Sequence, residues 1–235
     1  MRRWKPKTLR VLVILMILLP ALAGCTATKP RGPLVTDYFP LEAGNSWTYQ
    51  VGSGENAMTV DVTAQPGGKY QGNETTAFYY RLSGNVTQVE YYAGDWSRIE
   101  QVRTNKMIGG YATGSSGATS FLQLEEDPPL LLLDLNALVP PYQWQVDQKL
   151  IADGTAALSS STAFTAVGFE TVTVPAGNFP QALHIRFTRT IKAADGTIQV
   201  VVGDRWFAPG VGLVKAVDHM GSVTMEMLLK GFTIR

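Results

Sequence analysis

Cysteine and histidine are almost absent from this sequence, which limits the chemistry that the chain could support. Only one of the 235 residues is a cysteine, Cys25, and only two are histidines, His184 and His219. A single cysteine has no partner for an internal disulfide. The two histidines are too far apart for a ligand pair of the His-x-x-x-His kind, so the sequence predicts no metal site.

Sequence signatures of catalysis are also missing. The chain has no Gly-x-Ser-x-Gly nucleophile motif and no glycine-rich loop that continues into a phosphate-binding lysine. We therefore predict no catalytic residues, no cofactor and no enzymatic activity. The less favoured alternative is a hydrolase that uses two carboxylates. Its candidates on expected strands are Glu90, Glu100, Asp147, Glu170 and Asp204.

A large excess of charge of either sign is missing too. The whole chain has 20 basic and 19 acidic side chains, a formal charge of +1. Five of the basic residues lie within the first ten positions, and the remainder of the chain carries a formal charge of −4. A weakly acidic body does not attract nucleic acid electrostatically, so we expect no nucleic-acid partner.

The first 24 residues have the order of an export signal. A basic start is followed by an apolar run over 11–19, which is too short to cross a membrane as a helix of ~20 residues. The run ends in Leu22-Ala23-Gly24-Cys25, which resembles the lipobox of bacterial lipoproteins. The resemblance implies cleavage before Cys25, diacylglycerol on the Cys25 sulfur and acylation of the new amino terminus. The alternative is an ordinary secreted protein with a cysteine in its leader.

This resemblance also implies where the protein is located. We expect a protein of the cell envelope that is anchored to the membrane through the lipid on Cys25 and faces outside the cytoplasm. Thr26 replaces the aspartate that commonly retains lipoproteins at the inner membrane. It therefore predicts the outer membrane if the source has one, and otherwise the outer face of the cell membrane.

The remainder of the chain predicts a short tether and one β domain. Residues 25–38 contain Pro30 and Pro33 without periodicity, which favours a lipidated N-terminus followed by a flexible tether. Residues 39–235 alternate between apolar and polar side chains, the period of half-buried strands. Strands are expected over 46–51, 58–63, 78–82, 86–92, 96–102, 121–124, 144–148, 164–174, 183–191, 198–207, 213–217 and 223–234.

These strands predict a mainly β fold. We expect an antiparallel sheet that is strongly curved or partly closed, like a half-barrel, with at most one short helix or flap. A β-sandwich is the alternative. Turns are expected at Gly84-Asn85, Gly94-Asp95, Asp153-Gly154 and Asp195-Gly196, and a loop over 109–116.

The segment 128–141 interrupts this pattern. It is apolar over 130–133 and lies between two proline pairs, so it could be a helical turn, a buried crossing segment or a flap over a cavity. Similar approaches to Trp47 and Trp144 also suggest two halves, 39–127 and 142–235, within the domain.

Aromatic residues are the most distinctive feature of the predicted strands. Most are expected in the core and in cross-strand pairs. A subset could instead line an apolar trough that binds an acyl chain or the face of a sugar. The candidates for this lining are Trp47, Tyr80, Tyr92, Trp96, Trp144 and Trp206.

Two motifs carry a family resemblance. The first is Val172 to Phe179, of the form V-x-V-P-A-G-x-F, and the second is Trp206 to Val214, of the form W-[FY]-A-P-G-V-G-L-V. With the opening Tyr38 to Tyr49, they resemble a group of uncharacterised bacterial lipoproteins and exported proteins. The motifs favour structural turns because proline and glycine dominate them. More loosely, the expected curved sheet is similar to the half-barrels of the lipoprotein carriers of the Lol system, an analogy of fold alone.

Two functions remain open at this point. The first is a non-enzymatic, lipid-anchored binding or assembly module with a protein partner in the envelope. The second is a carrier or sensor of an apolar ligand, such as an acyl chain or a lipid, in a cavity of the curved sheet.

Overall fold

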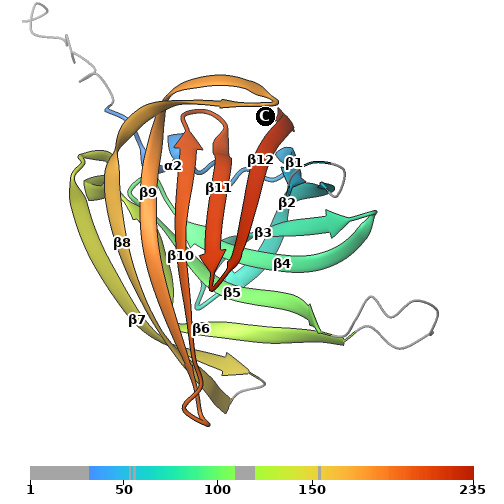
Figure 1. Cartoon of the computed structure of the whole chain (residues 1–235), viewed down its shortest axis with the longest axis vertical. Helices are drawn as coiled ribbons and strands as arrows, with labels where there is room; N and C mark the ends of the chain where they lie inside the picture. Colours follow the sequence, from blue (N-terminus) through green and yellow to red (C-terminus); the bar gives the residue numbers. More distant parts are fainter. Residues whose placement is uncertain (1–31, 53, 55–56, 109–119, 153–154) are drawn as a thin grey trace, which may run out of the picture. The chain divides into compact units, whose positions relative to one another are not determined.

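Twelve antiparallel strands form a closed barrel in the described part of the chain (Figure 1). The computed structural model describes residues 32–235 except 53, 55–56, 109–119 and 153–154. Each strand pairs with the next along the chain, and the last pairs with the first. The strands are β1 (Ser46–Val51), β2 (Met58–Tyr70), β3 (Asn73–Leu82), β4 (Asn85–Gly94), β5 (Arg98–Ile108), β6 (Ser120–Asp134), β7 (Tyr142–Ala152), β8 (Thr155–Val174), β9 (Gly177–Ala193), β10 (Ile198–Ala208), β11 (Gly212–Met220) and β12 (Val223–Thr233).

The predicted mainly β, antiparallel, strongly curved sheet is confirmed, and the sheet closes completely. The alternation of side chains in β1 shows why the sheet curves: Trp47, Tyr49 and Val51 are buried, while the residues between them are half-buried. Successive side chains of a strand point to opposite faces, so a curved sheet turns one set toward a common interior. The β-sandwich alternative is wrong because all twelve strands belong to one continuous sheet.

Several sequence predictions lie outside the described residues. These are the signal peptide 1–24, the lipidation of Cys25, the loop over 109–116 and the turn at Asp153-Gly154. The turn expected at Gly84-Asn85 is formed one residue earlier, by Ser83 and Gly84, both of which have positive φ. Positive φ at both central residues is the geometry of a tight hairpin turn.

A single helical turn, α2 (Val35–Tyr38), precedes the barrel and packs against it. Val35 is fully buried and Tyr38 nearly so. The Val35 N–H donates to the Trp96 carbonyl at 3.1 Å, and the Gly210 N–H donates to the Asp37 carbonyl at 2.7 Å. Residues 34–38 therefore belong to the packed body, although the sequence predicts a tether up to residue 38. No helix in the described residues has the length and hydrophobicity needed to span a membrane.

The segment 128–141 forms barrel wall followed by a 3₁₀ turn, η2 (Leu135–Leu138). Leu130 and Leu133 are buried, so the interpretation as a flap is wrong. The turn starts because the Asp134 carboxylate accepts hydrogen bonds from the Asn136 and Ala137 N–H groups, at 2.9 and 3.1 Å.

The pairing between β6 and β7 is short. Among the described residues, Leu124–Asp127 of β6 are the ones that pair with β7. Beyond them, the Trp144 indole N–H donates to the Leu131 carbonyl at 3.0 Å. The predicted halves 39–127 and 142–235 thus lie on either side of this pairing within one barrel.

Both sequence motifs form turns between neighbouring strands. The first, Val172 to Phe179, is the tip of the β8–β9 hairpin, which curls over one end of the barrel (Figure 1). Its Ala176 N–H donates to the Leu229 carbonyl of β12 at 2.9 Å, and Phe179 packs on Phe232. The second motif contains the β10–β11 turn that holds α2 through Gly210.

Candidate ligand cavity

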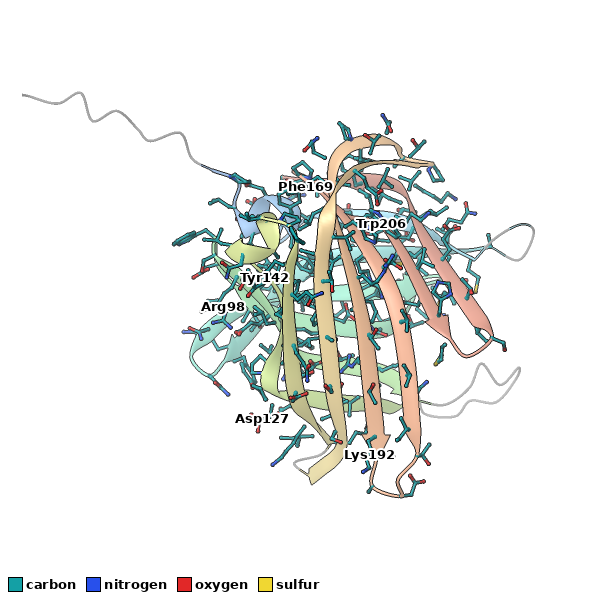
Figure 2. The ribbon with its side chains drawn as sticks, turned by 60° about the vertical axis from the view of Figure 1, so that its left-hand side comes forward. Arg98, Asp127, Tyr142, Phe169, Lys192 and Trp206 are labelled. Atoms are coloured by element: carbon teal, nitrogen blue, oxygen red, sulfur yellow. The ribbon has the colours of Figure 1, made fainter. Side chains whose placement is uncertain are left out.

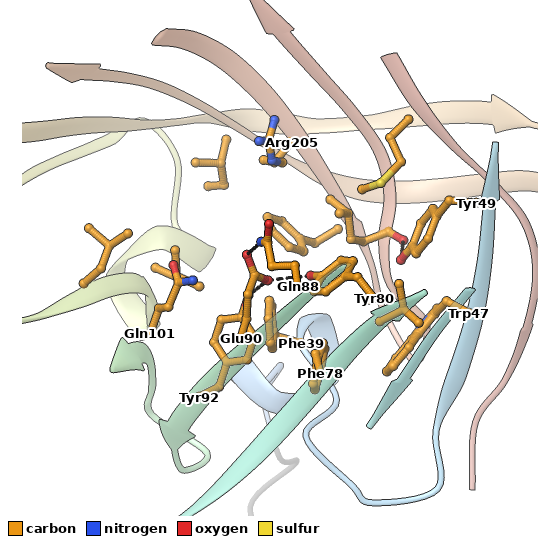
Figure 3. A pocket seen from close by; sticks show the side chains of 18 of the residues that line it. Phe39, Trp47, Tyr49, Phe78, Tyr80, Gln88, Glu90, Tyr92, Gln101 and Arg205 are labelled. Carbon is orange, nitrogen blue, oxygen red and sulfur yellow. Dashed lines mark hydrogen bonds between the residues drawn. The ribbon is translucent and has the colours of Figure 1, made fainter. Parts of the chain in front are cut away.

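A cavity of about 500 Å³ lies inside the barrel (Figure 3). Every strand except β7 contributes to its wall. Most of the lining side chains are aromatic or aliphatic. The apolar ones are Phe39, Pro40, Trp47, Tyr49, Val51, Val60, Val62, Phe78, Tyr80, Tyr92, Leu130, Leu132, Phe164, Ile185, Phe187, Phe207, Leu213, Met225 and Met227.

A cluster of aromatic rings closes one end of the cavity. Phe39, which follows α2, is its centre. The Phe39 ring centroid lies 4.9 Å from Tyr92, 5.6 Å from Phe78 and 5.9 Å from Phe207, so the ring joins β3, β4 and β10. Trp47 packs on Phe78 from β1. The segment after α2 therefore acts as the plug of this end.

The glycine of the second motif allows this plug to approach. Gly212 has φ of +93°, and a Cβ placed there would lie 3.1 Å from the Pro40 ring. The Trp47 indole N–H donates to the neighbouring Val211 carbonyl at 2.7 Å. The β10–β11 turn thus fixes both the plug and the tryptophan at the closed end.

One lining side chain is exposed to solvent. Met225, close to the β11–β12 turn, has 46 % of its surface exposed, whereas the other lining residues are buried or half-buried. We therefore identify the surroundings of Met225 as the mouth of the cavity.

One carboxylate, Glu90, lies inside the barrel and is held by three donors. The Tyr80 and Tyr92 hydroxyls each donate to its Oε2 at 2.5 Å, and the Gln88 amide donates to its Oε1 at 2.6 Å (Figure 3). Burial, and then the Glu90 charge, hold the pKa of both tyrosines well above the usual value. The tyrosines therefore stay protonated and act as donors.

Two arginines also line the cavity. Arg205 forms a bidentate ion pair with Asp218, at 2.7 and 2.9 Å, and its guanidinium lies over the Phe187 ring at 4.9 Å. Arg189 of β9 donates from Nε to the Ser160 hydroxyl at 2.9 Å. The cavity is thus apolar with a few placed polar groups, as is typical of small-molecule sites.

Three of the six aromatic residues predicted to line a trough do line this cavity: Trp47, Tyr80 and Tyr92. Their contact with a ligand stays a prediction. Trp96 does not line it, because it lies in the β4–β5 turn with 57 % of its surface exposed. Trp144 does not line the cavity either. Its ring stacks at 4.9 Å on Phe164, a lining residue, and its indole N–H donates to the Leu131 carbonyl between β6 and β7.

Trp206 lies apart from the cavity as well. Its indole stacks on the His184 ring at 4.5 Å, and its N–H donates to Glu170. Its neighbours Arg205 and Phe207 line the cavity, and successive side chains of a strand face opposite sides, so Trp206 is on the outer face. In Figure 2, Trp206 and Phe169 lie toward the end of the barrel where β8 curls over.

Two of the five candidate carboxylates meet at this outer cluster. His184 Nε2 is 2.6 Å from Asp204 Oδ1, and Nδ1 is 3.3 Å from Glu170 Oε1. Burial alone would raise the pKa of Asp204, but hydrogen bonds from His184 and Arg186 lower it. Among the described residues, no group of three or more His, Cys, Asp or Glu side chains is arranged to hold a metal ion.

Sequence reasoning did not single out the polar residues of the interior as a group. The signal was present in the alternation. Arg189 falls on the same side of its strand as Ile185 and Phe187, and Glu90 on the same side as Tyr92. A charged residue at a position where the alternation predicts an apolar side chain was therefore the sequence signal for the polar lining of the cavity.

Two solved structures share this fold. One is an inferred exported protein with a YmcC-like fold from Bacteroides fragilis, which is 13% identical, matches with a TM-score of 0.50, and covers 83% of this chain and 98% of its own. The other is an inferred lipoprotein from Parabacteroides distasonis, which is 13% identical, matches with a TM-score of 0.52, and covers 86% of this chain and 100% of its own. No protein-family model matches the sequence, and no curated protein is similar enough to count as a relative. At this identity the comparisons establish the fold of the barrel.

Proposed function

We propose that this chain is a lipid-anchored protein of the bacterial cell envelope whose barrel binds a small apolar or amphipathic ligand without changing it chemically. The observation that carries the proposal is the apolar cavity of about 500 Å³, plugged at one end by Phe39 and open near Met225. Cavities of roughly 300–1,000 Å³ with few polar groups are the usual form of small-molecule sites.

The location outside the cytoplasm is supported by the sequence and by the similar structures. The leader ends in Leu22-Ala23-Gly24-Cys25. Both structures that share the fold are described as exported or as a lipoprotein. A lipid anchor would hold the barrel at a membrane, which is also where apolar ligands are concentrated.

A binding role is favoured over chemistry because the interior carboxylate and one interior arginine already have partners. Glu90 accepts three hydrogen bonds, and Arg205 is paired with Asp218. A general acid or base needs access to a proton on the substrate. Between the two functions left open by the sequence, the enclosed cavity favours a carrier or sensor of a small ligand over an assembly module.

The proposal is tested by native mass spectrometry of the whole processed protein, released gently from its own membranes, with its lipid extract analysed in parallel. Met227→Trp fills the cavity, because Met227 lines it from β12. Val200→Trp is the matched control, because Val200 is 46 % exposed on β10 and does not line the cavity. We expect a bound small molecule in the wild type and in the control, and its loss in Met227→Trp.

Two results would contradict the proposal. One is a wild-type protein that carries no bound molecule after extraction and after incubation with its own lipid extract. The other is equal retention by all three proteins, which would place the bound molecule outside the barrel.

A further inference from the structure

Three charged side chains line the described cavity, and they differ in the hydrogen-bond and ion-pair partners that they already have. Glu90 is surrounded by the Tyr80 and Tyr92 hydroxyls and the Gln88 amide. Arg205 has the Asp218 carboxylate. Arg189 has only the Ser160 hydroxyl, and its guanidinium forms no ion pair with any carboxylate in the described part of the chain.

A second polar group beside Arg189 also lacks a partner. Thr162 of β8 is the direct cross-strand neighbour of Arg189 on β9, and both side chains line the cavity. Thr162 is 1 % exposed, and its hydroxyl makes no hydrogen bond within the described structure. A buried hydroxyl without a partner is costly, and Thr162 belongs to the cavity wall, so its hydroxyl is a candidate partner for a polar group of a ligand.

Glu126, the carboxyl group whose pKa the Arg189 charge lowers, is a poor counter-ion for Arg189. Glu126 is 3 % exposed, and its carboxylate accepts from the Gln148 amide at 2.9 Å. Burial raises the pKa of Glu126, and the Arg189 charge only partly offsets this effect. The positive charge at this place of the wall therefore remains available to a ligand.

Arg189, Thr162 and Glu90 together favour a ligand with a negative charge. An arginine guanidinium presents a planar fork of donors that matches a carboxylate, and a threonine hydroxyl can add one more donor. A cationic ligand would have to displace the three donors that already occupy Glu90. The remaining wall toward Phe39 is aromatic and aliphatic, which suits a hydrocarbon chain.

We infer that the cavity takes an anionic amphiphile, a long-chain carboxylate, whose carboxylate binds at the Arg189 guanidinium and the Thr162 hydroxyl while its chain lies among the aromatic side chains. This inference rests on the proposed function, because it names the chemical class of the ligand for the same cavity. It assigns Arg189 and Thr162 as the residues that determine specificity.

The test uses the whole processed protein in lipid nanodiscs and two photoreactive probes. The first probe is palmitic acid with a diazirine in its chain, and the second is the methyl ester of the same molecule. After illumination, labelled peptides are identified by mass spectrometry. We expect the acid to label the cavity-lining strands roughly tenfold more than the ester, the effect of one charge-assisted hydrogen bond.

Variants of the two residues separate charge from packing. Arg189→Met and Thr162→Val should lower labelling by the acid and leave labelling by the ester unchanged. Arg189→Lys should retain part of the preference because it keeps the charge. Arg186→Met is the matched control, since Arg186 is an exposed arginine on the outer face of the same strand, and it should change neither probe.

The outcomes distinguish the inference from the proposed function. Equal labelling of the cavity by acid and ester would overturn the inference and leave the proposed function standing. Absence of cavity labelling by both probes would overturn both. If Arg189→Met does not fold, the acid-to-ester ratio of the wild type and of Thr162→Val decides the inference.

Discussion

Substituting Phe39 by alanine should destabilise the barrel by about 3–5 kcal/mol, the range for removing a buried phenylalanine from a packed core. Phe39 is 8 % exposed, and its ring contacts rings on three different strands. These neighbours are large and fixed by their own strands, so they cannot collapse into the space that the ring leaves. The loss should therefore combine the missing burial with a residual cavity at the closed end.

The assay is equilibrium unfolding in urea, followed by tryptophan fluorescence, of the chain from Thr26 onward. Phe169→Ala is the matched control, because Phe169 is 37 % exposed and its ring lies 6.0 Å from that of Tyr38. The control should cost less than about 1.5 kcal/mol, as expected for a partly exposed ring in one aromatic pair.

The assignment of Phe39 as the plug would be refuted by a loss below about 1 kcal/mol, which is typical of an average substitution. A loss no larger than that of Phe169→Ala would refute it equally. Either result would mean that the segment after α2 does not close the barrel.

Three further predictions concern the wall. Gly203→Ala should lower the free energy of unfolding by about 1–3 kcal/mol, because the new Cβ would lie 2.5 Å from the Phe187 ring. Gly168→Ala is the control and should be nearly neutral, because a Cβ at Gly168 would have no neighbour within 4 Å. Equal losses for the two variants in urea unfolding would contradict this packing. Glu126→Gln should gain stability relative to the wild type as the pH rises from 4 to 7. Because burial raises the pKa of Glu126 in the folded protein, the protonated carboxyl group contributes stability to the wild type in full below the usual pKa of 4.5, and this contribution is lost as the pH rises through the folded pKa. A stability difference between the two proteins that does not change with pH would refute the assignment. Trp144→Phe should lower the free energy of unfolding by about 1 kcal/mol and speed amide hydrogen exchange in β6, because it removes the indole N–H that donates to the Leu131 carbonyl. Unchanged exchange in β6 would show that this hydrogen bond does not hold β6 and β7 together.

The strands were predictable because alternation is a local signal. Leu183, Ile185 and Phe187 alternate with polar neighbours in the sequence, and β9 places Ile185 and Phe187 inside the barrel. Complete closure was not predictable in this way. It depends on the pairing of β1 with β12, between residues such as Trp47 and Phe232 that are far apart in the sequence.

The start of the packed body was harder to read from the sequence. Val35 and Tyr38 are buried, yet they lie in a single helical turn that is too short to show a helical period. Their burial depends on the Trp96 and Gly210 backbones, which come from distant turns. Local composition, with Pro30 and Pro33 nearby, therefore indicated a tether.

The aromatic lining was predictable only in part, for a similar reason. Trp47, Tyr80 and Tyr92 continue apolar faces of their strands, and the barrel brings those faces together. Trp206 also lies on a strand, but its neighbour Phe207 occupies the interior face and turns Trp206 toward His184. Which face is interior follows from closure, not from the residue type.

An experimental electron-density map would test most directly whether the barrel encloses a ligand. The protein would be purified from its own membranes with a sterol-based detergent, whose fused rings cannot be mistaken for an acyl chain. We predict continuous, unbranched density that runs from Arg189 and Thr162 toward Phe39 and Phe78 inside the barrel. A cavity that holds only separate water molecules, or one closed by inward movement of its side chains, would contradict the proposed function.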